Sequence, residues 1–490
     1  MSGLVLGLDQ GTSSTRCVAL DADLRERGSA AIPVAASFPR SGLVEQDPEE
    51  LVRSARDAIA GALARAGAGA REVAALGIAN QTETFVVWER ASGRAIHPAI
   101  VWQDRRTDEA CAALRAAGHA ERVRARTGLE LDATFPATKL RWVLDHVEGA
   151  RAAAEDGRLA YGDVAAWLLH RLAGVHVTDA GNAGRSLLCP LGGADWDDEL
   201  LELFGIPRAL LPPVVDSDGI DAVTELDGSG TALPIRAAAG DQQASLFGLR
   251  CWEAGSAKIT LGTGAFVLAQ AGSTPPAPPP GVLASCAWRR AGTASYALEG
   301  FIPAAGAAVD WFSGAGALPR GGELDALLRS AGPGDTEVMC VPALQGLGTP
   351  SWEAGVRGAV LGLSLGTTRA QLARAVVDGV LQQVTDALEA MREVTALDAV
   401  RLDGGLARSD WIVQRLADIA GLRVERTTRP DSTALGAAAL AGLAAGVWDR
   451  PDELPEIPVD LVAEPELPAP ERLRLRDRWA SARALVAGWR

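Results

Sequence analysis

The chain has 490 residues, 48% of them hydrophobic, which is long enough for more than one buried core. Its 62 acidic residues outnumber its 47 basic ones, and the net charge of −15 disfavours nucleic acid or an anionic membrane as a partner. The six cysteines are dispersed and the apolar N-terminal run stops at Asp9. We therefore expect no disulfide or zinc framework and no signal peptide, and we place the protein in the cytoplasm.

Strand and helix patterns alternate through the first half of the chain. Two apolar runs within residues 4–20 flank a Gly/Thr/Ser turn and predict a β-hairpin. A helix is expected at 49–65 and a strand at 73–78. Between residues 100 and 250, helices such as 138–146 alternate with short strands.

The second half repeats this order, beginning with a hairpin at 256–268 around another Gly/Thr turn. The later elements are a helix at 304–312, strands at 338–342 and 400–402, helices that begin at Arg369 and Asp410, and a terminal helix at 471–489. Two hairpin-led halves predict an α/β protein of two similar lobes with a cleft between them. We place the boundary near residue 250, which gives lobes 1–250 and 251–490.

The two hairpin turns are candidate phosphate-binding loops. Successive N–H groups and hydroxyls in such turns suit a phosphate, and Asp9 at the end of the first strand could hold Mg²⁺ beside it. A single Gly/Thr/Ser turn is more often an ordinary turn than a phosphate site. One such turn in each half of the chain makes a chance occurrence a poorer explanation. The sequence lacks G-x-x-x-x-G-K-[ST] and the protein-kinase motifs, which excludes a Walker-type NTPase and a protein kinase.

Asp241 follows a strand of small residues and opens a predicted helix that runs to Leu249. As a helix N-cap it would be ordinary, because Asp is a preferred capping residue. As a general base at a strand end, it could accept a hydroxyl proton during phosphoryl transfer. The sequence leaves both interpretations open.

Polar residues follow two further predicted strands. Glu83 could hydrogen-bond a polyol and Trp102 could pack on its carbon face, although a Trp is more often a core residue. Arg105 and Arg106 are most simply interpreted as a solvated helix start. The pair at 404–405, Gly-Gly, would let a flat ring approach the backbone, which suits an adenosine site.

Ordered motifs over nearly the whole chain resemble those of the FGGY family of carbohydrate kinases. In the first half they are LDQGTSSTR (8–16), GIANQTET (77–84), AIVWQDRRT (99–107), TFPATKLRWVLDHVEG (134–149), HVTDAGNAGRSLL (176–188), DWDDELLELFGIPRALLP (195–212) and AGDQQASLFG (239–248). In the second half they are LGTGAF (261–266), YALEG (296–300), GLGTPSW (346–352), RGAVLGL (357–363), LDGGLARSDW (402–411) and TALGAAALAGLAAG (433–446). So many matches in the right order make chance negligible.

The resemblance implies two ribonuclease-H/actin-like lobes that close on a sugar or polyol, with ATP and Mg²⁺ as cofactors. Asp9 then lies near the Mg²⁺, and Asp241 is the catalytic base. The implied ATP-binding residues are Thr12, Ser13, Ser14, Arg16, Gly262, Thr263, Gly306, Asp310, Gly405 and Ser409. At Asp310 and Ser409 the family pattern has Gln and Asn instead. A homo-oligomer is compatible with the family, although the sequence displays no interface.

The acceptor pocket is where the chain departs from the family members that phosphorylate glycerol, which it otherwise most resembles. Those members have Arg at the position of Thr82 and Tyr at that of Thr134. The implied substrate-binding residues are Thr82, Glu83, Trp102, Thr134, Asp241, Gln242 and Phe266. Each lost neutral contact costs about 0.5–1.5 kcal/mol and frees volume. We therefore expect weak activity on glycerol, or a longer small polyol phosphorylated at a terminal hydroxyl. The alternatives are a kinase for a tetritol or ketopentose and an inactive ATP-binding, actin-like protein.

Overall fold

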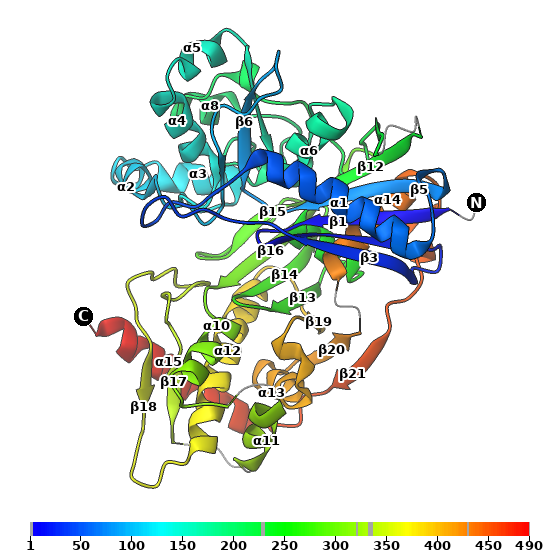
Figure 1. Ribbon diagram of the computed structural model, residues 1–490. Helices are drawn as coiled ribbons and strands as arrows, with labels where there is room; N and C mark the ends of the chain where they lie inside the picture. The colour runs from blue at the N-terminus through cyan, green and yellow to red at the C-terminus, as the bar shows by residue number, and fades with distance from the viewer. Residues whose placement is uncertain (1–2, 227–230, 320–321, 332–336, 429–430, 490) are drawn as a thin grey trace.

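Each half of the chain forms one large sheet, and Figure 1 shows the N-terminal half above and the C-terminal half below. The computed structural model describes residues 3–226, 231–319, 322–331, 337–428 and 431–489. Helices pack on both sheets, which is the predicted α/β fold of two lobes.

The first sheet has the strand order β11-β12-β5-β1-β2-β3. Its strands are β1 (Leu4–Gln10), β2 (Ser14–Leu20), β3 (Glu26–Pro33), β5 (Val73–Asn80), β11 (Ala222–Thr224) and β12 (Leu233–Gly240). β1 pairs antiparallel with β2, which confirms the first hairpin, and β1, β5 and β12 run parallel. Their carboxyl ends therefore meet at one edge of the sheet, where α/β folds place ligands.

The second sheet has the order β15-β16-β14-β13-β19-β20-β21. Its strands are β13 (Ser256–Leu261), β14 (Ala265–Gly272), β15 (Leu283–Arg290), β16 (Thr293–Ile302), β19 (Ala399–Asp403), β20 (Arg423–Thr427) and β21 (Val459–Ala463). The antiparallel hairpin β13–β14 again continues through parallel strands, here β19 and β20. This repeat of order and direction confirms the prediction of two similar halves.

A four-stranded sheet and short helices complete the upper part of the first lobe (Figure 1). The strands, in spatial order, are β4 (Glu45–Gln46), β7 (Ala99–Ile100), β6 (Phe85–Glu89) and β8 (Leu159–Asp163), and β9 (Thr178–Asp179) pairs separately with β10 (Val214–Val215). The helices are α2 (Asp108–Ala116), α3 (Ala120–Thr127), α4 (Pro136–His146), α5 (Ala150–Glu155), α6 (Val164–Ala173), α7 (Ala180–Gly184) and α8 (Asp198–Phe204).

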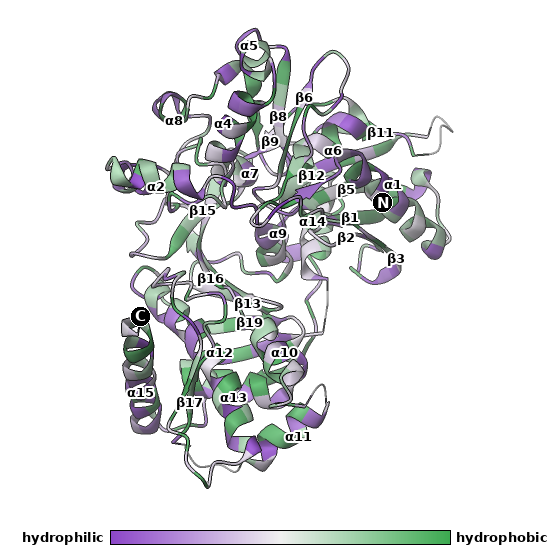
Figure 2. Ribbon diagram, turned by 60° about the vertical axis from the view of Figure 1, so that its left-hand side comes forward, coloured by the Kyte–Doolittle hydropathy of each residue, from purple (hydrophilic) through white to green (hydrophobic). Residues whose placement is uncertain are grey.

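Alternating residues of β1 pack into two separate hydrophobic cores, one on each face of the first sheet. Leu6 and Leu8 point into the core that contains α1 (Pro48–Ala66), whereas Val5 points into the core with α9 (Asp241–Gly248) and α14 (Ser432–Ala444). Helix α14 belongs to the second half by sequence, yet it packs on β1, β5, β12 and α9, as Figure 2 also shows. The division at residue 250 stays a prediction, and α14 reaches across it.

Small residues explain how α14 lies so close to the first sheet. A Cβ placed on Gly7 would be 1.8 Å from the carbonyl oxygen of Ala434, and one on Gly77 would be 1.9 Å from that of Ala437. Only glycine permits this approach of helix backbone to strand backbone. Within α14, a Cβ on Gly436 would lie 1.8 Å from the carbonyl oxygen of Ala244, so the helix needs glycine where it meets α9.

The remaining helices surround the second sheet. They are α10 (Gly306–Gly314), α11 (Gly322–Ser330), α12 (Arg369–Met391), α13 (Asp410–Ala420) and α15 (Ala469–Gly488), with the strand pair β17 (Met339–Val341) and β18 (Ala359–Leu361). The terminal helix α15 folds back onto α12, α13 and β17. In the described ranges, no helix is both long enough and apolar enough to cross a membrane.

Candidate active site

Three predicted site residues lie where the parallel strands of the first sheet end. Gln10 and Gly240 both pair with Asn80, so the ends of β1, β5 and β12 are in line. Asp9 is the last residue but one of β1, Glu83 follows β5, and Asp241 follows β12. The topology thus brings together three carboxylates that are 74 or more residues apart along the chain.

Asp241 is not the N-cap of α9. Gly240 occupies that position, and Asp241 is the first helical residue. Within the described ranges, its carboxylate accepts a hydrogen bond only from the adjacent N–H of Gln242, at 2.7 Å to Oδ1. Burial raises the pKa of Asp241 to about 6, and the negative charge of Glu83 adds to this. The positive charge of Lys258 acts against both effects and lowers the pKa of Asp241. A carboxylate with this pKa and few structural partners suits a general base.

Asp9 is close to charged side chains from the beginning, the middle and the end of the chain. Burial raises its pKa to about 7, the charges of Asp241 and Asp431 add to this, and Arg16 opposes it. Arg16 forms an ion pair with Asp431 at 2.7 Å. Among the described residues, no group of three or more His, Cys, Asp or Glu is placed to hold a metal ion.

A cluster of buried glutamines holds the first hairpin turn. Gln81 Nε2 donates to Gln46 Oε1 at 2.9 Å and to Gln10 Oε1 at 3.2 Å, and Gln46 Nε2 donates to the Thr12 carbonyl at 2.6 Å. Trp102 is half-buried, and its Nε1 donates to Thr12 Oγ1 at 3.0 Å. Trp102 is therefore not a core residue. It joins the predicted acceptor residues to the predicted phosphate turn, where Ser13 is exposed and Ser14 is partly exposed.

The second hairpin turn is held by the start of α10. The N–H of Gly306 donates to the Gly262 carbonyl at 2.9 Å, and the N–H of Ala305 donates to the Thr263 carbonyl at 2.9 Å. A Cβ on Gly306 would lie 2.6 Å from the Gly262 oxygen, so the position requires glycine. Gly405 is exposed, and no atom would lie within 4 Å of a Cβ placed on it, which leaves its surface open.

Two other predicted nucleotide residues differ in their surroundings. Asp310 is exposed on α10, and the described residues give its side chain no hydrogen bond. The Ser409 hydroxyl donates to Asp325 and accepts from the N–H of Ile412 at 3.3 Å, which caps α13. Ser409 thus already has a structural role.

Glu83 belongs to a buried ion bridge that reaches the second sheet. Arg185 Nε donates to Glu83 Oε1 at 2.6 Å, while its Nη1 and Nη2 donate to Glu299 Oε2 and Oε1 at 2.8 and 3.1 Å. The side chains of all three residues are 4–6% exposed. Glu83 also has a φ of +64°, in the left-handed region that non-glycine residues rarely adopt.

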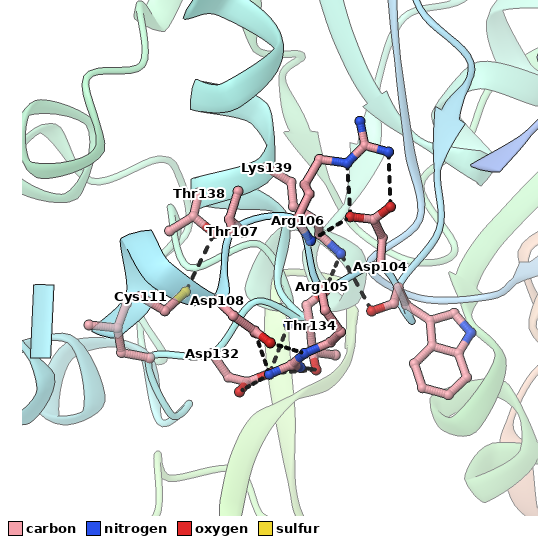
Figure 3. Close-up of polar contacts among 12 residues, drawn as sticks. Asp104, Arg105, Arg106, Thr107, Asp108, Cys111, Asp132, Thr134, Thr138 and Lys139 are labelled. Atoms are coloured by element: carbon pink, nitrogen blue, oxygen red, sulfur yellow. Dashed lines mark hydrogen bonds and ion pairs between the residues drawn. The ribbon is translucent and has the colours of Figure 1, made fainter. Parts of the chain in front are cut away.

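Thr134 lies in a polar cluster whose members Figure 3 labels. Its Oγ1 donates to Asp132 Oδ1 at 2.7 Å, and Arg105 pairs with both oxygens of Asp132 at 2.7 and 3.0 Å. Burial alone would raise the pKa of Asp132, but Arg105 lowers it to about 2. Fully buried Lys139 donates from Nζ to the carbonyls of Thr134 at 2.8 Å and Trp102 at 3.5 Å. Lys139 thus ties two predicted acceptor residues together.

The interpretation of Arg106 as solvated is wrong. Its side chain is 3% exposed, and it donates to Asp104 Oδ1 at 2.8 Å (Figure 3). It also donates to Glu45 Oε1 at 2.6 Å. Its guanidinium also lies 4.5 Å from the Trp142 ring centroid. Arg105 is the more exposed member of the pair, but it too is held, by Asp132 and Asp108. The buried neighbour Asp104 and the distant Glu45 together hold Arg106 inside the fold.

The other predicted acceptor residues come from both lobes. Thr82 is buried against Gly240, because a Cβ there would lie 2.4 Å from Thr82 Cγ2. Gln242 Oε1 accepts from Lys258 Nζ of β13 at 2.7 Å. Phe266 of β14 is half-buried, with its ring centroid 4.9 Å from that of Phe301.

Sequence reasoning missed the cations and the carboxylate that hold these residues, namely Arg185, Lys139, Lys258 and Glu299. The rarity of lysine in this chain could have pointed to the two lysines. Only two of the 47 basic residues are lysine, and both are fully buried at this site. No comparable signal marked Arg185 or Glu299, because their partners are more than 100 residues away.

Comparison with known proteins identifies the family. Its models, "FGGY family of carbohydrate kinases", match residues 4–248 as the N-terminal domain and 257–445 as the C-terminal domain. A glycerol kinase from Methylobacterium nodulans is 46% identical, covering 100% of this chain and 99% of that protein. One from Aromatoleum aromaticum is 45% identical, covering 99% of each. The structure of Plasmodium falciparum glycerol kinase with ADP has a TM-score of 0.93 at 26% identity, covering 99% of this chain and 98% of that one. The chain therefore belongs to the FGGY family of carbohydrate kinases.

Proposed function

We propose that this carbohydrate kinase transfers the γ-phosphoryl group of Mg·ATP to a terminal hydroxyl of glycerol or a closely related small polyol. The observation that carries this is the position of Asp241 at the end of β12, within electrostatic range of Glu83 and Asp9. Among the residues that the structure describes, its carboxylate accepts a hydrogen bond only from the N–H of its neighbour Gln242. Full-length relatives named glycerol kinase support glycerol as the acceptor.

Asp241 is the general base of this reaction. Its carboxylate accepts the proton of the reacting hydroxyl as that oxygen forms a bond to the γ-phosphorus, and the bond to the β,γ-bridging oxygen breaks to release ADP. Glu83 accepts a hydrogen bond from a second hydroxyl. N–H groups and hydroxyls of the two turns, around Thr12 and Thr263, hold the phosphates.

Asp9 fits a magnesium ion that arrives with ATP. Mg²⁺ is usually held by one or two carboxylates together with substrate phosphates and water, so a complete protein cage is not needed. The charge of Asp241 raises the pKa of Asp9, which a nearby cation would reverse. When bound, the ion would neutralise charge on the phosphates, with Asp9 as its protein ligand.

The role of Asp241 is tested by Asp241→Asn. We expect kcat for glycerol phosphorylation, followed by ADP release, to fall by about 10²- to 10⁴-fold, the usual contribution of a general base. Binding of a non-hydrolysable ATP analogue should be unchanged, which controls for folding. A kcat within about threefold of the wild-type value would exclude Asp241 as the base, because loss of a general base costs far more than that.

A tetritol or ketopentose is the second candidate acceptor, and the small side chains of Thr82 and Thr134 favour it. The Thr134 hydroxyl is already hydrogen-bonded to Asp132, so it has less to offer a short polyol. ADP release should be compared across glycerol, tetritols, pentitols, ketopentoses and aldoses. If Thr82 limits glycerol binding, Thr82→Arg will raise kcat/KM for glycerol by several-fold, and no improvement would contradict that role.

A further inference from the structure

The ion bridge through Arg185 links the acceptor side of the first lobe to the second lobe. Glu83 and Arg185 belong to the first sheet's half of the chain, whereas Glu299 is on β16 of the second sheet. Glu83 uses one oxygen, Oε1, to accept from Arg185. Its other oxygen, Oε2, accepts no hydrogen bond from the residues that the structure describes, so it is available to a ligand.

The backbone of Glu83 needs outside support. A φ of +64° is unfavourable for a residue with a side chain, and such geometry persists only where the surroundings fix it. The charge-assisted hydrogen bond from Arg185 supplies that support. The guanidinium itself is held over the ring of Phe135, 5.4 Å from its centroid.

Glu299 determines how Arg185 meets Glu83. A guanidinium prefers to bind a carboxylate with two parallel N–H groups, which would occupy both oxygens of Glu83. Here Nη1 and Nη2 each donate to Glu299, and in the orientation this fixes, the guanidinium donates to Glu83 through Nε, to Oε1. By holding the guanidinium at its two Nη atoms, the second lobe fixes an orientation in which Arg185 contacts Oε1 of Glu83 and leaves Oε2 free.

We propose that Arg185 and Glu299 are positioning residues for the acceptor, which keep Glu83 in place with Oε2 open to a substrate hydroxyl, a role that rests on the proposed function of Glu83. Among the described residues, neither Arg185 nor Glu299 forms a side-chain hydrogen bond or ion pair with the predicted phosphate turns. Their loss therefore affects the KM for the acceptor more than the KM for ATP or kcat.

The test compares Glu83→Gln, Glu299→Gln and the double variant of the full-length protein, with glycerol as the acceptor. We expect Glu299→Gln to raise the KM for glycerol about tenfold, as for loss of one charged hydrogen bond. The KM for ATP should stay within about twofold of wild type. The KM for glycerol of the double variant should be no higher than that of Glu83→Gln, because the positioning role of Glu299 runs through Glu83.

A matched control is Asp386→Asn. Asp386 is also a buried carboxylate of the second lobe, and it accepts from Arg476 at 2.6 Å, Trp479 at 2.9 Å and Arg483 at 2.7 Å. Its substitution should lower stability and leave the KM for glycerol unchanged. If Glu299→Gln does not fold, Arg185→Lys, which keeps the charge but not the fork, should raise the KM for glycerol in the same way.

The outcomes separate this role from the proposed function. A raised KM in Glu83→Gln together with an unchanged KM in Glu299→Gln, or effects that multiply in the double variant, would overturn the positioning role alone. An unchanged KM in Glu83→Gln would overturn the acceptor site and the positioning role together.

Discussion

The acceptor side and the nucleotide side of the site are built from different groups. On the acceptor side, buried side chains such as Glu83, Arg185 and Lys139 hold one another through charged hydrogen bonds. On the nucleotide side, turns around Thr263 and Gly405 present mainly backbone, and both residues are exposed. Acceptor recognition should therefore depend on a preorganised set of side chains. Nucleotide binding should instead depend on backbone shape, and hence on where glycine is required.

The largest effect is expected from Lys139→Met on the acceptor side. The change leaves the carbonyls of Val101, Trp102 and Thr134 without their shared donor, which we expect to cost about 2–3 kcal/mol in unfolding free energy. The KM for glycerol should rise as well, because Trp102 and Thr134 lose a common anchor. Chemical denaturation and steady-state kinetics measure the two effects.

Arg141→Met is the matched control for Lys139→Met. Arg141 is on the same helix, α4, but its side chain is 52% exposed, and its one ion pair within the described part of the chain is with Asp145 at 3.5 Å. Its loss should change stability by less than about 0.5 kcal/mol. Equal effects of the two changes would show that the acceptor side is no more preorganised than the surface.

The nucleotide side should respond most to an added methyl group at Gly306. Gly306→Ala would place a Cβ 2.6 Å from the Gly262 carbonyl oxygen, so the second turn must move. We expect the KM for ATP to rise about tenfold, within the cost of overpacking a tight contact. The KM for glycerol should change little.

Gly314→Ala, at the other end of α10, controls for the substitution itself. No atom lies within 4 Å of a Cβ at that position, so the KM for ATP should stay at the wild-type value. Helix stability should rise by about 0.5–1 kcal/mol. A raised KM for ATP in Gly314→Ala would mean that α10 as a whole, rather than its contact with the turn, controls nucleotide binding.

The pH dependence of kcat/KM tests whether Asp241 is the group that titrates. Burial raises its pKa to about 6, and a general base works only when deprotonated. kcat/KM should therefore be constant above about pH 7, half-maximal near pH 6, and fall about tenfold for each further pH unit below that. A profile that stays flat to pH 4.5 would indicate an unperturbed carboxylate, with a pKa of about 3.9.

Local patterns were enough to predict the hairpins and the strand ends. Apolar runs with Gly/Thr turns mark β1–β2 and β13–β14, and a carboxylate after a buried strand marked Asp241. The packing of α14 on the first sheet could not be predicted, because it depends on Gly7 and Gly77 meeting Ala434 and Ala437 in space.

The supporting residues of the site were harder to predict for the same reason. Whether an arginine is solvated or buried depends on carboxylates that only the fold brings near it. Arg106 illustrates this in part, since Asp104 is two residues before it but Glu45 is 61 residues away along the chain. Arg185 and Glu299 illustrate it further, since they are 114 residues apart.

The smallest effect is expected where a side chain on the nucleotide side is removed. Asp310 is exposed and unpartnered within the described chain, so Asp310→Ala should change the KM for ATP by less than about threefold and stability by less than about 0.5 kcal/mol. Asp132→Ala is the counterpart on the acceptor side, where it removes bonds to Arg105 and Thr134 and should cost about 1–2 kcal/mol. Thermal unfolding and ATP titration compare the two variants directly. If Asp310→Ala raised the KM for ATP more than Gly306→Ala, a side chain and not backbone shape would govern nucleotide binding, and the two sides of the site would be built alike.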